Sequence, residues 1–358
     1  MVRLAAPVVP EVSLAVSKAK ATSIDIAHLA GVSQATVSRA LRGSPLVSEE
    51  TRERIRAAAE QLRYKVDKNA SNLRLQHSGT LALLLFEDPT TDGSNINPFF
   101  LSMLGSITRA CAQQGYDLLI SFQQFSTDWH ADYADSKKAD GIILLGYGDY
   151  LAYLDRLEKL VAIGTRFVRW GAVLPEQPGV SVGCDNFSGG QAVARHFIEQ
   201  GCRRIAFLGD ASSHYPEFFE RYRGYADALQ QAGLDVDDAL QVDAESTQMC
   251  GHTAMSELLG RGVAFDAVFA ASDLIAIGAM RALAEQGYKV PADVPVAGFD
   301  DIPMARFASP PLTTVLQDTR SAGEVLVDSL LRMIRGEPAQ SVMLPVKLMV
   351  RQSSVRPA

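Results

Sequence analysis

The sequence predicts two kinds of domain in one chain, a small all-α domain near the N-terminus and an α/β core of two doubly wound lobes. Capping residues and a glycine turn divide residues 22–66 into short helices. From residue 79 onward, short apolar runs alternate with helix-like stretches, which is typical of parallel sheets with crossover helices. The 358 residues, 47% of them hydrophobic, can build two or three domains with cores of their own.

Charge separates the two parts. The whole chain carries −7, yet residues 18–78 carry +5 and residues 79–358 carry −12. A basic end on an acidic body indicates a polyanionic partner at that end. The four cysteines form no CxxC pair and no apolar run is long enough to span a bilayer, so we expect no metal site, no membrane contact and a cytoplasmic location. Residues 1–21, interrupted by prolines, are expected to be a flexible leader.

The first predicted domain, residues 22–66, contains three short helices. Ser23 is expected to cap the first, whose apolar positions are Ile26, Leu29 and Ala30, and Gly31 supplies the turn. Ser33 caps a second helix through about Leu41. Ser48 caps a third, which carries Ile55, Ala58, Ala59 and Leu62. Two short helices across a glycine turn, braced by a third, make a helix-turn-helix unit.

The second helix of this unit has residue types suited to reading DNA. Val37 and Leu41, with Val32 in the turn, are expected to pack inward, so that Gln34, Ala35 and Ser38 face outward. Arg39 lies a turn further on, from where it can reach a base edge or a phosphate. Glutamine pairs with adenine, arginine with guanine, and a methyl group contacts thymine. Ser33, Thr36 and the first backbone amides suit phosphate oxygens. We therefore expect double-stranded DNA as the partner; a helical hairpin used only for packing is the alternative.

The segments SIDIAHLAGVSQATVSRALRG and VSEETRERIRAAAEQLRYKVDKNASNL closely resemble the headpiece of the LacI/GalR (lac repressor-like) family. The resemblance implies that Gln34, Ala35 and Arg39 read the operator and that Tyr64 closes the headpiece. It also implies a hinge at 67–78, with a hinge helix from Asn69 and a leucine, Leu73, that wedges into the minor groove. Val66 stands where the family usually has proline, and Leu73 could instead be an ordinary linker residue. The predicted DNA-binding set is Ser23, Ser33, Gln34, Ala35, Thr36, Ser38, Arg39, Tyr64, Asn69 and Leu73.

The larger part of the chain predicts two lobes with a cleft between them. Buried parallel strands are expected in the runs TLALLLF, YDLLISF, DGIILLG, RRIAFLG and DAVFAAS. Helices are expected at about 98–114, 187–200, 217–232, 248–260 and 273–286. The segment 310–318, a helix to about 335 and a strand near 342–350 suggest that the chain crosses back between the lobes. A cleft between two α/β lobes is a common ligand site.

The family resemblance extends over about 22–352 and identifies the core, residues 79–352, as periplasmic-binding-protein-like, with a tail at 353–358. The segments that carry it are NPFF, DNFSGG, RYRGYADAL, ASDLIAIGA and GFDDIP. The implied effector-binding residues are Phe99, Phe100, Trp170, Glu217, Arg221, Ser272 and Asp300, with Gln123 and Trp129 as weaker candidates. Carboxylates and guanidinium groups can each hold adjacent hydroxyls, while an aromatic ring stacks on a pyranose. Ser272 is shorter than the asparagine that the family often has there.

Several structural alternatives stay open for these residues. Asp300 can cap a loop, Arg221 can form a surface pair with Glu217 or Glu220, and the aromatic residues can belong to the core. The sequence contains no HExxH, GxSxG, P-loop lysine or GxGxxG motif and its six histidines are dispersed, so we expect no catalytic residue, no cofactor and no metal.

The function expected from these features is a ligand-responsive transcriptional regulator that represses carbohydrate-utilisation genes. One headpiece makes few base contacts, so a homodimer on a palindromic operator is expected. The small-molecule effector is expected to be a sugar bound between the lobes. The alternatives are a nucleobase or protein corepressor and, in another class, an exported solute-binding protein, which would need no basic headpiece.

Overall fold

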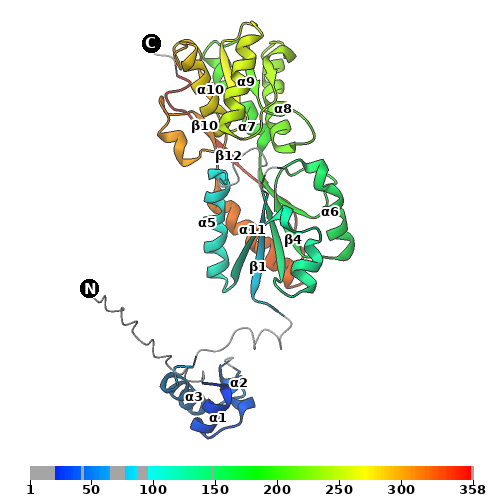
Figure 1. The fold of residues 1–358 in the computed structure, drawn as a ribbon, viewed down its shortest axis with the longest axis vertical. Coiled ribbons are helices and arrows are strands. Elements are labelled where there is room, and N and C mark those ends of the chain that lie inside the picture. The colour runs from blue at the N-terminus through cyan, green and yellow to red at the C-terminus, as the bar shows by residue number, and fades with distance from the viewer. Residues whose placement is uncertain (1–20, 42–43, 65–76, 87–95, 147, 356–358) are drawn as a thin grey trace, which may run out of the picture. The chain divides into compact units, whose positions relative to one another are not determined.

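The computed structural model describes residues 21–41, 44–64, 77–86, 96–146 and 148–355. The chain divides into two compact units, Met1–Leu75 and Gln76–Ala358, which are described separately below (Figure 1). The predicted leader falls almost entirely outside the described residues, as does most of the predicted hinge, including Asn69 and Leu73. None of the helices in the described ranges is long and apolar enough to cross a membrane.

The first unit contains the three predicted helices, α1 (Ser23–Ala30), α2 (Gln34–Leu41) and α3 (Glu49–Gln61). Thr22, and not Ser23, is the N-cap of α1. Its backbone N–H donates to Asp25 Oδ2 at 2.7 Å and its hydroxyl accepts the Asp25 N–H at 3.4 Å, which completes a capping box. The prediction for Ser23 was therefore wrong by one residue. Gly31 ends α1 at φ +66°, a left-handed conformation that glycine adopts without strain.

The core of this unit lies where the three helices meet. Its buried residues are Ile26, Ala27, Val37, Ala40, Val47, Ile55, Ala58 and Ala59, and Val32, Leu41, Leu62 and Tyr64 pack against them. Leu29, which we expected to face inward, is 45% exposed. The buried residues of α1 are Ile26 and Ala27, and Ala30 is half-buried on the same side; the rotation of the helix leaves Leu29 beside them. The inward packing of Val37 is confirmed.

The second unit begins with the N-terminal lobe, a six-stranded parallel sheet in the order β11-β5-β4-β3-β1-β2. Its strands are β1 (Thr80–Leu85), β2 (Asp117–Phe122), β3 (Gly141–Leu145), β4 (Phe167–Trp170), β5 (Val180–Cys184) and β11 (Val342–Leu344). Helices α5 (Pro98–Gln113) and α11 (Thr319–Ile334) cover one face and α6 (Tyr150–Ile163) the other. Alternation along β1 produces this division, since Leu81 and Leu83 pack toward α5 whereas Ala82 and Leu84 pack toward α6.

Two features of this lobe differ from the prediction. Strand β2 was expected to be buried, but it forms the sheet edge and leaves Leu119 37% and Ile120 48% exposed. The elements α6, β4 and β5, together with the short helices η1 (Gln123–Phe125) and η2 (His130–Asp135), were not predicted. The strands β4 and β5 are only four and five residues long, so an alternating or continuous apolar pattern is too short in them to be recognised from sequence.

The C-terminal lobe has a four-stranded parallel sheet in the order β7-β6-β8-β9. Its strands are β6 (Ile205–Leu208), β7 (Gln241–Val242), β8 (Ala267–Ala270) and β9 (Val296–Ala297). Its helices are α7 (Asn186–Glu199), α8 (Pro216–Gln231), α9 (Gln248–Gly260) and α10 (Asp273–Glu285), with η3 (Asp238–Leu240) and η4 (Pro303–Arg306). Helix α7 packs on α8, and α9 packs on α10.

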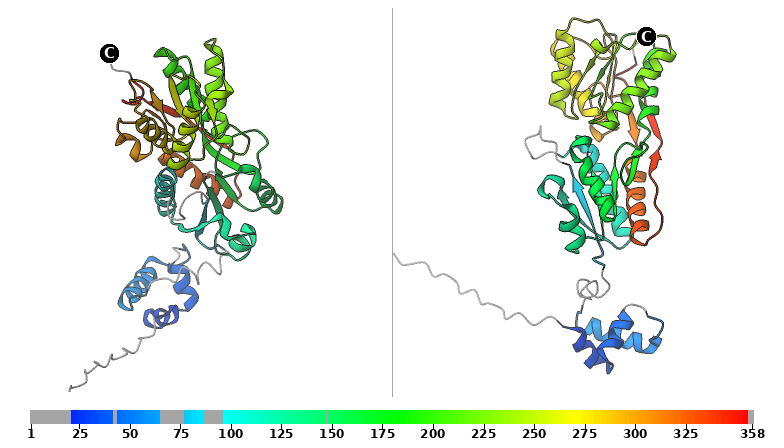
Figure 2. Two further views of the ribbon diagram at one scale, coloured as in Figure 1. Left: turned by 45° about the horizontal axis from the view of Figure 1, so that its top comes forward. Right: turned by 90° about the vertical axis from the view of Figure 1, so that its right-hand side faces the viewer.

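The chain passes between the lobes at three places, which confirms the predicted crossing. It leaves the N-terminal lobe after β5, returns between β10 (Thr314–Gln317) and α11, and leaves again between β11 and β12 (Val346–Met349). Strands β10 and β12 pair antiparallel in a small sheet of their own. Figure 2 shows these late segments running from one lobe to the other. The ends of the parallel strands of both lobes are thereby held near one another.

Ser353 and Ser354, which we placed in a tail, are fully buried and extend the C-terminal lobe beyond residue 352. Ser353 Oγ accepts the Thr313 N–H at 2.8 Å and donates to the Val296 carbonyl at 2.7 Å. We expect Ser353→Ala to lower the free energy of unfolding by about 1–3 kcal/mol, because a buried N–H loses its acceptor. Urea denaturation measures this, with the exposed neighbour Gln352→Ala as the control. Equal midpoints for the two variants would contradict the prediction.

Candidate DNA-binding and effector sites

The outward face of α2 presents most of the residues predicted to contact DNA. Gln34, Ala35 and Arg39 are exposed, whereas Val37 and Ala40 lie buried beneath them. Thr36 and Ser38 are half-buried at the border of this face. The sequence therefore places an amide, a methyl group and a guanidinium on one solvent-facing surface, which is the set of groups that reads base edges in a major groove.

The beginning of α2 is fixed by local hydrogen bonds. Ser33 Oγ accepts the Thr36 N–H at 3.1 Å and shares a hydrogen bond of 2.8 Å with the Thr36 hydroxyl. Gln34 Nε2 donates to Ser23 Oγ at 2.9 Å, which links the start of α2 to the start of α1. An amide nitrogen carries two hydrogens, so this bond orients Gln34 and still leaves one hydrogen for a base. Ser23 thus supports the side chain of Gln34, and a direct contact of Ser23 with DNA stays a prediction.

Tyr64 follows α3 and packs against the core of the same unit. Its backbone N–H donates to the Ala59 carbonyl at 2.8 Å. This position at the end of the three-helix unit agrees with a closing role. A direct contact of Tyr64 with DNA stays a prediction.

In the C-terminal lobe, Arg221 and Asp300 come together as a buried pair. Arg221 is fully buried on α8, and its Nη1 lies 3.6 Å from Asp300 Oδ1. Its Nε donates to Asn186 Oδ1 at 2.8 Å, and the guanidinium lies 3.8 Å from the centroid of the Phe299 ring. A surface pair of Arg221 is therefore excluded, and Glu220 pairs with Arg223 instead.

Asp300 has the strained backbone and shifted acidity that are common at ligand sites. Its φ is +118°, a left-handed value that side chains disfavour, and the next residue, Asp301, has φ +49°. Burial raises the pKa of Asp300 to about 7, although Arg221 and a hydrogen bond from Gln317 Nε2 (2.6 Å) act in the opposite direction. Burial, followed by the neighbouring Asp300, also raises the pKa of Asp273. Two buried carboxyls thus lie close enough that each disfavours ionisation of the other.

Ser272 lies at the end of β8 as the N-cap of α10, where its hydroxyl accepts the Ile275 N–H at 3.3 Å. It also accepts a hydrogen bond of 2.8 Å from the Ser246 hydroxyl. Ser246 Oγ in turn accepts one of 3.2 Å from Asn97 Nδ2 at the start of α5. This chain of polar groups joins the two lobes on the side where α5 begins.

The predicted aromatic residues lie in the core of the N-terminal lobe. Phe99 is 1% exposed, and its ring centroid lies 5.3 Å from that of Phe100 and 5.9 Å from that of Trp170. These contacts agree with the core alternative, and a stacking role toward a ligand stays a prediction. The weaker candidates are buried too: Gln123 donates to the Leu84 carbonyl, and Trp129 packs beneath Arg156.

Glu217 connects the two lobes from the first turn of α8. Its Oε1 accepts the backbone N–H of Ala172, which follows β4, at 2.8 Å. Four neighbouring residues were missed as candidates, namely Arg169, Asn186, Asp273 and Gln317. Asn186 and Asp273 stand inside segments quoted above, and Gln317 lies in the segment 310–318. Whether their side chains face Arg221 or Asp300 depends on tertiary packing, which a local sequence pattern does not show.

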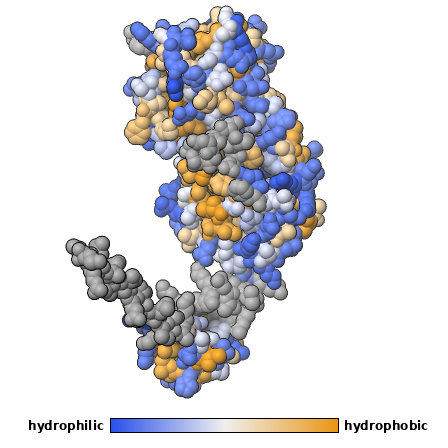
Figure 3. All heavy atoms as spheres, viewed as in Figure 1, coloured by the Kyte–Doolittle hydropathy of each residue, from blue (hydrophilic) through white to orange (hydrophobic). Residues whose placement is uncertain are grey.

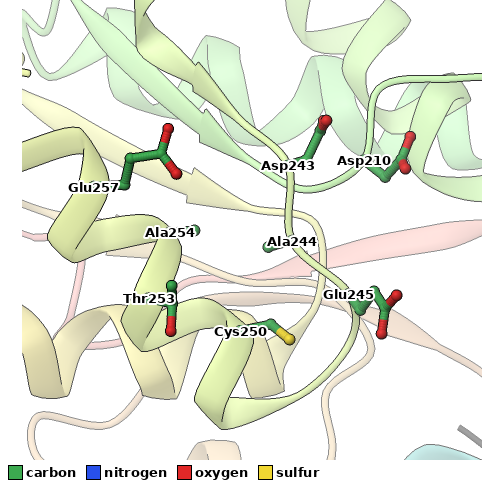
Figure 4. A pocket seen from close by; sticks show the side chains of 8 residues that line it. All are labelled: Asp210, Asp243, Ala244, Glu245, Cys250, Thr253, Ala254 and Glu257. Atoms are coloured by element: carbon green, nitrogen blue, oxygen red, sulfur yellow. The ribbon is translucent and has the colours of Figure 1, made fainter. Parts of the chain in front are cut away.

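A separate hollow of about 340 Å³ lies between α9 and the segment that follows β7 (Figure 4). Carboxylates gather around it, from Asp210, Asp243, Glu245 and Glu257, with Cys250 on α9 beside them. None of the predicted effector residues lines it. Among the described residues, no group of three or more His, Cys, Asp or Glu side chains is placed to hold a metal ion. The buried Arg221–Asp300 pair therefore remains the better candidate for ligand recognition.

A helix-turn-helix unit joined to two α/β lobes with a buried charged pair defines a DNA-binding protein with a ligand-binding core. Comparison with known proteins agrees. Residues 23–67 match the family described as bacterial regulatory proteins, lacI family, and residues 194–354 match the periplasmic binding protein-like domain. The chain belongs to the LacI family of transcriptional regulators.

Individual relatives cover nearly the whole chain. The HTH-type transcriptional regulator CelR of Thermobifida fusca is 34% identical over 92% of this chain and 96% of its own length. GalR of Escherichia coli is 33% identical over 82% of this chain and 84% of its own length. Both are regulators by name, which agrees with the expectation that the function is regulation and not catalysis.

Solved structures agree in fold. A CelR–cellobiose complex matches with a TM-score of 0.68 at 33% identity, covering 93% of this chain and 99% of the other. The lac repressor dimer bound to operator and the anti-inducer ONPF matches with a TM-score of 0.79 at 26% identity, covering 94% and 99%. The predicted fold class is thereby confirmed.

Proposed function

We propose that this regulator is a repressor that binds a palindromic operator as a homodimer and releases or tightens that binding when a sugar occupies the space between its lobes. The buried Arg221–Asp300 pair carries the ligand part of the proposal. It offers a donor and an acceptor 3.6 Å apart, a spacing suited to adjacent hydroxyl groups of one ring. The CelR relative, whose solved complex holds cellobiose, supports a carbohydrate as the ligand.

The DNA part of the proposal rests on α2. We infer that Gln34, Ala35 and Arg39 contact base edges, while Ser33 and Thr36 hold phosphates. Operator DNA is in the cytoplasm of a bacterium, and the proposal therefore includes a cytoplasmic location. The solved structure of the lac repressor dimer is bound to its operator, which supports operator DNA as the partner of this chain.

The dimer is supported by an apolar face of the N-terminal lobe. Leu101 on α5 and the edge-strand residues Leu119 and Ile120 are between 37% and 48% exposed, and α5 contacts β2. Figure 3 shows hydrophobic residues gathered over α5. Exposed apolar surface of this kind marks a protein contact. Two headpieces held by a dimer give the symmetric reading of two half-sites that specificity requires.

The test combines operator selection with ligand addition. The purified full-length protein selects its operator from a random duplex library, and fluorescence anisotropy then measures binding with and without cellobiose, glucose, ribose, guanine or hypoxanthine. We expect a palindromic operator and a change in affinity of about 5–150-fold with at least one sugar. A response to a nucleobase alone would contradict the carbohydrate part and leave the DNA part intact. Selection of no preferred sequence would contradict the DNA part.

Saturation with the responding sugar also stabilises the folded state. At a hundredfold excess over the dissociation constant we expect about 2.7 kcal/mol of added stability, provided that the sugar binds only the native state. Thermal unfolding with and without the sugar measures this increase. It separates ligands that bind the core from additives that disturb only the DNA assay.

A further inference from the structure

Arg169 is a buried cation in the N-terminal lobe that the function described so far does not use. It is the third residue of β4 and only 2% exposed. Val168 and Trp170 pack on the α5 side of the sheet, so alternation directs Arg169 to the α6 side. There its guanidinium lies 5.2 Å from the centroid of the Tyr150 ring.

Arg169 has more N–H donors than it has hydrogen bonds to its surroundings. A guanidinium has five N–H donors and no acceptor. Nη2 donates to the Ala172 carbonyl at 3.5 Å, a long contact. Nε is buried and has no hydrogen-bond partner within the described part of the chain. A charged group taken out of water needs its donors satisfied, so an unused buried donor indicates a missing acceptor.

The surroundings of Arg169 lie where ligands bind in this class of fold. Ligands of open α/β sheets bind beyond the carboxyl ends of the strands, and Arg169 is one residue from that end of β4. Glu217 reaches the same place from the other lobe. A Cβ atom added to Gly171 would lie 2.9 Å from Glu217 Oε1 and 3.0 Å from Arg169 Nη1. Both charged groups therefore lie against Gly171, where a larger side chain would push one of them away.

Together with the first pair, these groups form a row of alternating charge. Glu217 and Arg221 are four residues apart on α8 and so share one helix face. From one lobe to the other the order is Asp300, Arg221, Glu217 and Arg169. A phosphate or carboxylate would meet a protein carboxylate beside either guanidinium. Hydroxyl groups both donate and accept, so they match this row without such repulsion.

We propose that Arg169 is a further effector-contacting residue, which donates hydrogen bonds from the N-terminal lobe to hydroxyl oxygens of a neutral polyhydroxyl ligand, while Glu217 accepts from the same ligand. The Tyr150 ring holds the plane of the guanidinium for this contact. The inference rests on the proposed function, because it requires a ligand between the lobes. It adds a contact from the lobe opposite Arg221 and Asp300, so that one ligand joins both lobes.

The test is calorimetric titration of the full-length protein with cellobiose, glucose, ribose and glucose 6-phosphate. The variant is Arg169→Lys, which keeps the charge beside Glu217 but loses the planar fork of donors. We expect the neutral sugar that binds the wild type to bind Arg169→Lys at least about tenfold more weakly, with the unliganded melting temperature changed by less than about 2 °C. The matched control is Arg156→Lys, which removes another arginine stacked on an aromatic ring of this lobe, Trp129 at 5.4 Å, and is expected to bind as the wild type does.

Four results would overturn the inference. Wild-type affinity in Arg169→Lys, with binding lost in Asp300→Asn, would refute Arg169 and leave the proposed function standing. A lower unliganded melting temperature in Arg169→Lys but not in Arg156→Lys would assign Arg169 a structural role. Binding of glucose 6-phosphate alone would refute a neutral ligand, and binding of none of the four sugars would refute the inference together with the sugar effector.

Discussion

Replacement of Arg39 by alanine is expected to abolish the preference of this regulator for its operator over other DNA. Arg39 is exposed on α2 next to the buried Ala40, and a specific arginine–base contact contributes about 1–3 kcal/mol of discrimination. A dimer makes the contact twice, so the loss is about 2–6 kcal/mol, or roughly 30-fold and more in affinity. Anisotropy titrations with the selected operator and a scrambled duplex of equal length measure it.

The control for this experiment is Arg54→Ala, which removes an exposed arginine from α3. Loss of a positive charge from the DNA-binding unit weakens attraction to every sequence about equally, so Arg54→Ala is expected to lower both affinities together, if it lowers them at all. Arg39→Ala should lower the operator affinity alone until it approaches that of the scrambled duplex. An unchanged ratio of the two affinities in Arg39→Ala would show that α2 is not the reading helix.

The second large effect is expected from Asp300→Asn, which should remove the response to the effector. An ionised carboxylate that accepts hydrogen bonds from a ligand contributes about 1.5–3 kcal/mol, so the dissociation constant is expected to rise about 10–150-fold. Operator binding without effector should persist, because Asp300 belongs to the second compact unit and α2 to the first. Asp243→Asn, in the acidic hollow beside α9, serves as the control and is expected to keep wild-type ligand affinity.

The raised pKa of Asp300 gives this prediction a pH signature. In the folded protein the group holds its proton up to a pKa of about 7, whereas in the unfolded chain it releases it near 3.8. Between these values the folded state binds more protons than the unfolded state, so the free energy of unfolding falls as pH rises from about 4 to 7 and levels off above. Asparagine does not titrate, so Asp300→Asn should reduce this slope in urea denaturation; the slope that remains includes the contribution of Asp273, whose pKa is raised as well.

Ligand binding should show the opposite dependence. Hydroxyl donors bind a carboxylate more strongly than a carboxylic acid, so the affinity of the wild type for its sugar is expected to rise through pH 7. In Asp300→Asn the residual affinity should be flat over the same range. Parallel pH profiles in wild type and variant would show that Asp300 does not contact the ligand.

Much of the fold was predictable because long periodic segments carry their own signal. Helix α5 was expected at about 98–114 and spans Pro98–Gln113, and α9 was expected at 248–260 and spans Gln248–Gly260. Their lengths allow an apolar stripe to repeat over several turns. The four-residue β4 has no such length, and β2 has the composition of a buried strand although no further strand covers its outer edge. Position in a sheet is not a local property.

The candidate sites also consist of a part that the sequence predicts and a part that depends on tertiary contacts. The sequence by itself determined the three-helix unit with Gln34, Ala35 and Arg39 outward, because turns, caps and helical spacing act over a few neighbouring residues. It also proposed Arg221 and Asp300 as effector-binding candidates, although 79 positions separate them in the printed numbering, through motifs that resemble one family.

Only the tertiary structure decided which side chains meet across the lobes. It buried Phe99 and Phe100 in a core, placed Glu217 against Ala172, and enclosed Arg169 with an unused donor. It also showed that Ser353 is a buried, hydrogen-bonded residue of the C-terminal lobe and not part of a tail. Such contacts join residues that are tens to hundreds of positions apart, and their free energies depend on burial and partners, which exist only once the chain has folded.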